Sequence, residues 1–184
     1  VQTGMGEARR LQNIRQLTLD GRRNVESSFA PDGKHLMFHS IRGENAHHQV
    51  FTMDLDGREV RLVSPGVGLA LCAAFAPDRP RILFASSHAT PAVDAGVPAP
   101  LDAALDVFES DVDGQNLSAL AAAPGYDGEA QYSPDGKRVV FTSARDGDLE
   151  LYVQELDGSG IRRLTHSPGP DGGGMFSPNG ARII

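Results

Sequence analysis

One short motif occurs four times in the chain, and this repeat constrains the fold more than any other feature of the sequence. Each copy starts with an aromatic residue and continues with Ala or Ser, then Pro, then Asp or Asn, at residues 29–34, 75–80, 132–137 and 176–181. The aromatic residues are 46, 57 and 44 positions apart. A repeat of this length indicates stacked supersecondary units that bury a common core.

The residues that follow each motif predict short strands joined by tight turns. Apolar runs occur at 36–38, 82–84, 139–141 and 183–184, and Asp-Gly pairs occur at 56–57, 113–114 and 157–158. In a Pro-Asp-Gly turn, proline fixes φ and glycine accepts a positive φ. Asp-Gly between apolar runs is a strong hairpin signal. Each complete unit is therefore predicted to contain four antiparallel strands.

A period of about 45 residues per four-stranded unit is typical of a β-propeller blade. A stack of hairpins in a β-sandwich is the alternative, but a sandwich does not require a repeat in this register. We predict an all-β propeller of four-stranded antiparallel blades. Its parts are an N-terminal segment 1–13, a strand 14–18 that closes a preceding blade, blades at 24–64, 72–120 and 127–165, and the start of a next blade at 172–184. A ring typically needs four to eight blades, so we expect the chain to be a fragment of a longer protein.

Composition excludes several classes of function. The chain of 184 residues has 17 basic and 24 acidic residues, which gives a formal net charge of −7. Binding to nucleic acid needs concentrated Lys and Arg, which this sequence lacks. No apolar run is long enough for a transmembrane helix. Cys72 is the only cysteine, so no internal disulfide is expected.

The sequence carries no pattern typical of a catalytic centre. It contains no His-Glu-x-x-His, no Gly-x-Ser-x-Gly and no P-loop. Its six histidines show no spacing typical of a metal-ligand set. We therefore predict no catalytic residue, no metal ligand and no cofactor in this segment.

Polar residues recur just before the repeated aromatic residue, where successive blades are joined. The candidate ligand-binding residues are Asn24, Glu26, Asp127, Glu129 and Asp171. Side chains at equivalent places on successive blades converge near the channel of a propeller, and grouped carboxylates favour a cation or a basic peptide. The alternative interpretation is that these residues cap turns by accepting backbone N–H bonds.

Loop lengths indicate which end of the blades binds. The Pro-Asp-Gly and Asp-Gly turns at one end are nearly uniform, whereas the other end holds all length variation, including an insertion at 88–105. Variable loops on a fixed scaffold usually carry binding. We therefore expect the variable end to be the working face, with 88–105 as either a lid or a neutral surface loop. Arg42 and Arg145, at equivalent places there, are expected to brace the loop against a neighbouring carboxylate; binding of a substrate is the alternative.

The third copy is the clearest one, with Tyr132-Ser-Pro-Asp-Gly-Lys137, then Phe141-Thr-Ser-Ala-Arg145, Leu156-Asp-Gly158 and Arg162-Arg-Leu-Thr165. These repeats resemble the WD40-like PD40 repeats of TolB-type β-propellers, from bacterial proteins of the Tol biopolymer transport type. Copy two departs from the pattern with Arg79-Pro80, and copy four departs with Asn179.

The resemblance implies a non-catalytic scaffold of the bacterial cell envelope, periplasmic or secreted, with a protein or peptide as partner. The same repeat also occurs in the propeller halves of prolyl-oligopeptidase-type peptidases and in oligogalacturonate lyases. A gating propeller of a larger hydrolase, or a sugar-lyase-like propeller, is therefore the alternative.

Overall fold

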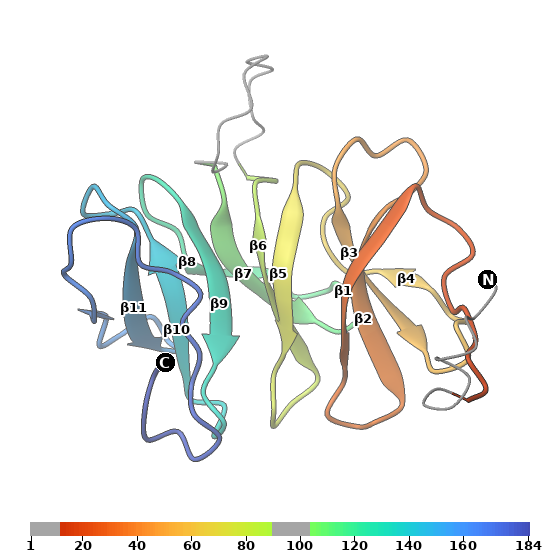
Figure 1. The fold of residues 1–184 in the computed structure, drawn as a ribbon. Helices are drawn as coiled ribbons and strands as arrows, with labels where there is room; N and C mark the ends of the chain where they lie inside the picture. Colours follow the sequence, from red (N-terminus) through yellow and green to blue (C-terminus); the bar gives the residue numbers. More distant parts are fainter. Residues whose placement is uncertain (1–11, 90–103) are drawn as a thin grey trace.

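The computed structural model describes residues 12–89 and 104–184, and this part of the chain forms strands and turns without a helix (Figure 1). The strands make three four-stranded antiparallel sheets, each in simple sequence order. The first sheet contains β1 (Arg23–Phe29), β2 (His35–Ile41), β3 (Gln49–Asp54) and β4 (Arg61–Leu62). The second contains β5 (Ala70–Phe75), β6 (Arg81–Ser86), β7 (Asp106–Asp111) and β8 (Ser118–Ala121). The third contains β9 (Asp127–Tyr132), β10 (Arg138–Ser143), β11 (Glu150–Glu155) and β12 (Arg162–Arg163).

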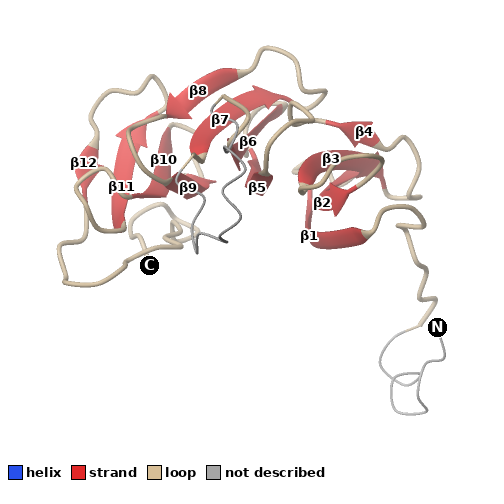
Figure 2. Ribbon diagram, turned by 90° about the horizontal axis from the view of Figure 1, so that it is seen from above, coloured by secondary structure: helices blue, strands red, loops and turns tan. Residues whose placement is uncertain are grey.

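The three sheets stand side by side in an arc, with equivalent strands at equivalent depths (Figure 2). The first strands β1, β5 and β9 line the concave side, and the last strands β4, β8 and β12 lie on the convex side. This arrangement confirms the predicted all-β propeller of four-stranded blades. We call the sheets blade 1, blade 2 and blade 3 in chain order.

The core lies between neighbouring blades, because each sheet buries its faces only against the next one. One cluster joins Met37, Val50 and Val63 of blade 1 to Ile82 and Phe84 of blade 2. A second cluster joins residues of blade 2 to blade 3, namely Leu83 and Val107 to Tyr132, Val139 and Phe141. The second strand of each blade is apolar at consecutive positions because both of its faces are covered.

The turns follow the chemistry predicted from the repeat. Asp32 Oδ1 accepts the backbone N–H of Lys34 at 2.8 Å, and Gly33 takes a φ of 64°. The Gly33 N–H closes the turn on the carbonyl of Ala30 at 3.0 Å. The side chain of Asp and the freedom of Gly together fix the connection between the first two strands.

Residues 14–18 were expected to form a closing strand, but the structure has no strand there. A closing strand forms by pairing with the third strand of its own blade, and the described residues contain no such partner for this segment. The segment nevertheless packs against blade 1. Its contact is equivalent to the one that the end of blade 1 makes with blade 2. The carbonyl of Leu17 lies against Gly57, and the carbonyl of Val63 lies against the equivalent Gly114.

The fourth copy of the repeat begins a further hairpin. Met175 and Ile184 exchange two backbone hydrogen bonds, at 3.0 and 2.9 Å, and Phe176 forms an antiparallel bridge with Ile183. Most of the predicted insertion 88–105 lies outside the described residues. At its edges, the His88 ring packs on Phe108 at 4.3 Å and Leu105 is buried. In the described part of the chain, no helix has the length and apolar character needed to span a bilayer.

Candidate functional site

Each first strand is interrupted by a bulge at the same place, three residues before the repeated aromatic. The residues there are Glu26, Cys72 and Glu129, with φ of 52°, 53° and 50°, and Gly173 takes 67° in the fourth copy. The pairing register with the second strand shifts at each of the three bulges. A left-handed conformation costs a non-glycine residue about 1–2 kcal/mol. Such strain at one repeat position marks this position as a candidate for function.

These bulges turn their side chains toward a shared hollow on the concave side of the arc, where β1, β5 and β9 lie (Figure 2). Glu26, Cys72 and Glu129 line it together with Gly173, Gly174 and Met175, and its volume is about 330 Å³. We call this hollow the concave pocket. It combines groups from all three blades and from the fourth copy.

The two glutamates of the concave pocket differ in how firmly they are held. Glu129 Oε2 accepts the hydroxyl of Thr142 at 2.8 Å and the backbone N–H of Gly173 at 2.7 Å. Glu26 is 63% exposed, and its Oε2 lies 3.1 Å from Nδ1 of His39. One carboxylate is therefore fixed between blades, and the other remains open to a ligand.

His39 is a buried part of this pocket and is only 2% exposed. Its Nε2 accepts the backbone N–H of Ala73 from blade 2 at 3.3 Å, so the proton of the neutral ring sits on Nδ1, facing Glu26. The 3.1 Å approach is close, but Nδ1 is not aligned for a hydrogen bond. Burial lowers the pKa of His39, and the nearby Glu26 opposes this shift only in part.

Cys72 lies between the two glutamates along the arc. Burial raises the pKa of its thiol to about 11, and the charges of Glu26 and Glu129 add to this shift. A thiol with this pKa is protonated at neutral pH and is a poor nucleophile. The concave pocket therefore presents carboxylates and neutral groups, which is a surface suited to binding a cation.

The structure divides the five predicted binding residues into two groups. Glu26 and Glu129 line the concave pocket. Asn24, Asp127 and Asp171 sit two residues earlier, where the chain enters each blade. Asp127 is fully buried; its Oδ1 accepts Arg145 at 3.0 Å and its Oδ2 accepts the N–H of Ala123 at 2.7 Å. These contacts hold the loops at this end of the blade in place, and we call such a set of contacts a brace.

Blade 1 repeats this brace with an amide in place of the carboxylate. Asn24 Oδ1 accepts the hydroxyl of Ser40 at 2.7 Å, and Arg42 donates to the same hydroxyl oxygen at 3.0 Å. The guanidinium of Arg42 stacks on Phe38 and Phe51, and that of Arg145 stacks on Phe141 and Tyr152, at 4.9–5.3 Å from the ring centres. Both arginines therefore tie a loop to the aromatic pair of their own blade.

Asp171 occupies the same place in the fourth copy. Its N–H donates to the carbonyl of Leu149 at 2.8 Å, and its buried Oδ2 has no hydrogen-bond partner within the part of the chain that the structure describes. The binding role predicted for Asn24, Asp127 and Asp171 stays a prediction.

Sequence reasoning did not single out His39, Cys72 and Gly173 as parts of a site. A usable signal was present, since Glu26, Cys72, Glu129 and Gly173 all lie three residues before the repeated aromatic. Residues 12–89 and 104–184 contain no group of three His, Cys, Asp or Glu side chains placed to hold a metal ion.

Comparison with solved structures places the fold among known propellers, while no protein-family model matches the chain. TolB from Acinetobacter baumannii superposes with a TM-score of 0.70 at 23% identity, over 88% of this chain and 37% of that one. A putative TolB from Agrobacterium tumefaciens gives 0.69 at 21% identity, over 86% and 52% of the two chains. The crystal structure of a nidogen/laminin complex gives 0.63 at 15% identity, over 87% and 55%. The chain has the TolB-like β-propeller fold, and it spans about half or less of the length of the two TolB chains.

Proposed function

We propose that the chain belongs to a non-catalytic propeller of the bacterial cell envelope, periplasmic or secreted, that binds a cationic segment of a protein or peptide. The single observation that carries this proposal is the repeated bulge. Glu26, Cys72 and Glu129 occupy one repeat position on three successive blades and line one pocket. The TolB-like fold supports a scaffold role and the envelope location.

The chemistry of the concave pocket favours a cationic ligand. Glu26 is mostly exposed, so it reaches a partner at little cost in desolvation. Glu129 is already held by Thr142 and Gly173, so it loses little side-chain entropy on binding. We propose that these two carboxylates contact the ligand, and that Asn24, Asp127 and Asp171 support the pocket by holding the ends of the blades.

Fluorescence anisotropy with a labelled lysine–glycine peptide tests this proposal. We expect Glu26→Gln with Glu129→Gln to weaken binding about 3–10-fold and to reduce its salt dependence, because two charges facing the ligand are removed. Acetylation of the peptide lysines should have a similar effect. Glu44→Gln with Glu155→Gln is the matched control, since it removes two exposed carboxylates that do not line the pocket.

Alkylation of Cys72 by iodoacetamide reports on the same pocket. The peptide should protect Cys72, and the Glu26→Gln, Glu129→Gln variant should react faster without peptide because both carboxylates raise the pKa of the thiol. Equal loss of affinity in the control variant, or no protection of Cys72, would contradict binding at the concave pocket.

A further inference from the structure

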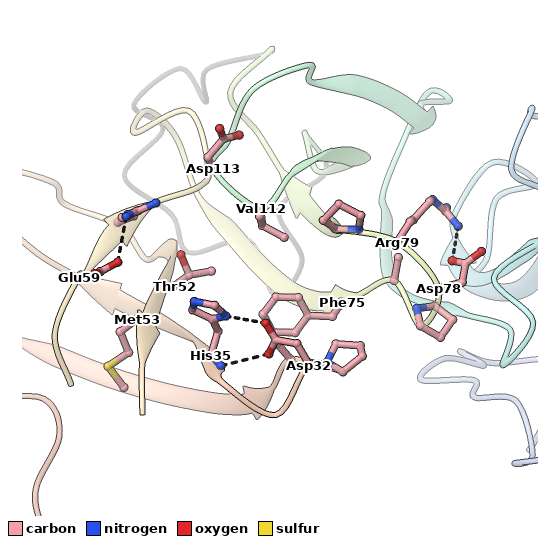
Figure 3. A pocket seen from close by; sticks show the side chains of 16 residues that line it. Asp32, His35, Thr52, Met53, Glu59, Phe75, Asp78, Arg79, Val112 and Asp113 are labelled. Atoms are coloured by element: carbon pink, nitrogen blue, oxygen red, sulfur yellow. Dashed lines mark hydrogen bonds and ion pairs between the residues drawn. The ribbon is translucent and has the colours of Figure 1, made fainter. Parts of the chain in front are cut away.

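A second hollow lies between blades 1 and 2, at the end that carries the Pro-Asp-Gly turns. We call it the first slot. It has a volume of about 420 Å³, and Met53, Phe75 and Val112 are among the apolar side chains that line it. Figure 3 shows Phe75 in the middle of the slot, with His35 and Asp32 beside it and Val112 and Asp113 above it. None of its lining residues belongs to the concave pocket.

Comparison with the equivalent slot between blades 2 and 3 shows what the first slot lacks. There, Arg79 from the turn of blade 2 lies over the ring of Tyr132, with 5.3 Å between its Cζ and the ring centre. Arg79 also donates to the carbonyl of Gly136 at 3.0 Å and to Glu109 at 2.9 Å. Tyr132 donates its hydroxyl to Glu109 at 2.6 Å. A guanidinium and a carboxylate therefore fill that slot.

At the junction between blade 3 and the fourth copy, an arginine also lies over the repeated aromatic ring, but it comes from a position two residues later in the repeat. Arg138 lies over the ring of Phe176 at 5.4 Å. An arginine of the preceding blade thus covers the repeated aromatic in both of these junctions. Its planar, delocalised cation suits the face of an aromatic ring.

The first slot has small or neutral residues at these positions. Gly33 stands where blade 2 has Arg79, His35 stands where blade 2 has Arg81, and Thr52 stands where it has Glu109. His35 Nδ1 lies 2.7 Å from Asp32 rather than over the ring of Phe75. Among the described residues, no arginine or lysine lies over Phe75. The ring that is covered by a cation at the other junctions is open here.

Charge around the slot suits a cation from outside. Asp32, Glu59, Asp78 and Asp113 contribute four carboxylates to its lining, against the two guanidinium groups of Arg61 and Arg79. Arg61 is paired with Glu59 at 2.9 Å, and Arg79 is directed toward blade 3. Asp32 is about half exposed and lies near Phe75 in Figure 3, whereas Asp78 is paired with Arg79 at 2.7 Å on the side of blade 3.

We propose that the first slot binds an arginine side chain of a protein partner, which lays its guanidinium on Phe75 and so completes the arrangement that Arg79 and Arg138 make within the chain. The volume of the slot accommodates this side chain together with part of the segment that carries it. The slot is a separate recognition site, at the opposite end of the blades from the loops expected to form the working face.

NMR titration of the isotope-labelled protein with the peptide Gly-Gly-Arg-Gly-Gly tests the proposal. We expect shifts confined to residues around Phe75 and Asp32, weaker binding of the lysine peptide, and no binding of the citrulline peptide, which keeps the planar shape but lacks the charge. Phe75→Leu keeps the apolar bulk and removes the aromatic face, so it should raise the Kd about 3–10-fold.

A second variant keeps the test decisive if Phe75→Leu fails to fold. His35→Arg supplies an internal guanidinium from the position that Arg138 uses, and it should abolish peptide binding and raise the Tm. Glu26→Gln with Glu129→Gln should leave this binding unchanged, which separates the slot from the concave pocket. Equal binding of the arginine and citrulline peptides, unchanged affinity in His35→Arg, or shifts that map elsewhere would overturn the proposal.

Discussion

His39 shows how one buried side chain couples the concave pocket to stability. It belongs to β2 of blade 1, but its Nε2 accepts a backbone N–H from β5 of blade 2. A protonated ring cannot accept this hydrogen bond, and burial also disfavours its charge. Both effects keep His39 neutral in the folded protein.

We expect His39 to make the protein less stable as the pH falls below 6.5. Its pKa is lowered from the usual 6.5 in the folded state, so the unfolded chain binds more protons in the window below that value. Stability therefore rises with pH through this window and is lost as the pH drops. Urea unfolding at pH 7 and pH 5 measures how much of the free energy of unfolding is lost between these two pH values. This loss should be smaller in His39→Gln than in the unmodified protein, by at most about 2 kcal/mol.

The control for this measurement is His47→Gln, which changes an exposed histidine of the same blade. It should keep the pH profile of the unmodified protein. Superimposable profiles for His39→Gln and the unmodified protein would mean that His39 titrates alike in the folded and unfolded states.

At the scale of the element, blades 1 and 3 are each tied at one end by a polar brace, whereas blade 2 has Ala70 at the equivalent position. Blade 3 uses a buried carboxylate with Arg145, and blade 1 uses Asn24 with Ser40 and Arg42. The arginines also cover the aromatic pairs that join the second and third strands. The brace therefore holds the loop, the first strand and the centre of the sheet together.

We expect the two braces to differ in strength because only one contains a buried charge. Asp127→Ala leaves Arg145 without its partner, and breaking a buried ion pair costs about 3–5 kcal/mol. Arg145 is 20% exposed, so we expect a loss of about 3 kcal/mol. Asn24→Ala removes hydrogen bonds of an uncharged amide and should cost about 1 kcal/mol. Urea denaturation measures both.

A different pair of substitutions shows whether Asp127 acts on the ligand directly. Asp127→Asn with Asp171→Asn should weaken peptide binding if these carboxylates face the partner. Unchanged affinity together with a clear loss of stability would instead identify them as turn braces alone.

At the scale of the whole molecule, the blades meet through close backbone contacts as well as apolar packing. Gly114 has a φ of 82°, and a Cβ at this position would lie 2.5 Å from the carbonyl oxygen of Val63 in blade 1. Gly158 occupies the same turn of blade 3 with the same φ, but nothing lies within 4 Å of its Cβ position. A substitution at Gly158 therefore tests backbone strain alone, whereas a substitution at Gly114 tests backbone strain together with the contact between blades.

We expect Gly158→Ala to cost about 1–2 kcal/mol, because alanine must adopt a left-handed conformation. Gly114→Ala should cost a further ~1–3 kcal/mol because it also forces blades 1 and 2 apart. Gly57→Ala should resemble Gly114→Ala, since the carbonyl of Leu17 would lie 2.7 Å from the new Cβ. Equal losses at Gly114 and Gly158, measured by urea unfolding with unchanged m-values, would show that the contact between blades carries no energy.

The fold could be predicted because its information is local and is repeated along the chain. Pro-Asp-Gly and Asp-Gly specify turns over a few residues, and consecutive apolar residues specify a strand covered on both faces. Repetition of both at a period of about 45 residues specifies a blade. The segment 14–18 shows the limit of this reasoning, because its pattern is that of a strand but no strand partner lies among the described residues.

The site could be predicted only in part, because a side chain at a bulge does not follow the alternation of a strand. Glu26 and Asn24 looked equivalent in sequence, yet one lines the concave pocket and the other braces a loop. His39 entered the site only because blade 2 packs on blade 1.

Patterns within single repeats specify the blade: the order of its strands, the turns that join them and the apolar run of its second strand. Which polar groups meet depends on the tertiary structure, because the concave pocket and the first slot each combine residues from more than one blade. The reason is physical: turn chemistry and strand patterning act within a few residues of chain, whereas burial, pKa and the filling of a hollow depend on what the neighbouring blade brings against it.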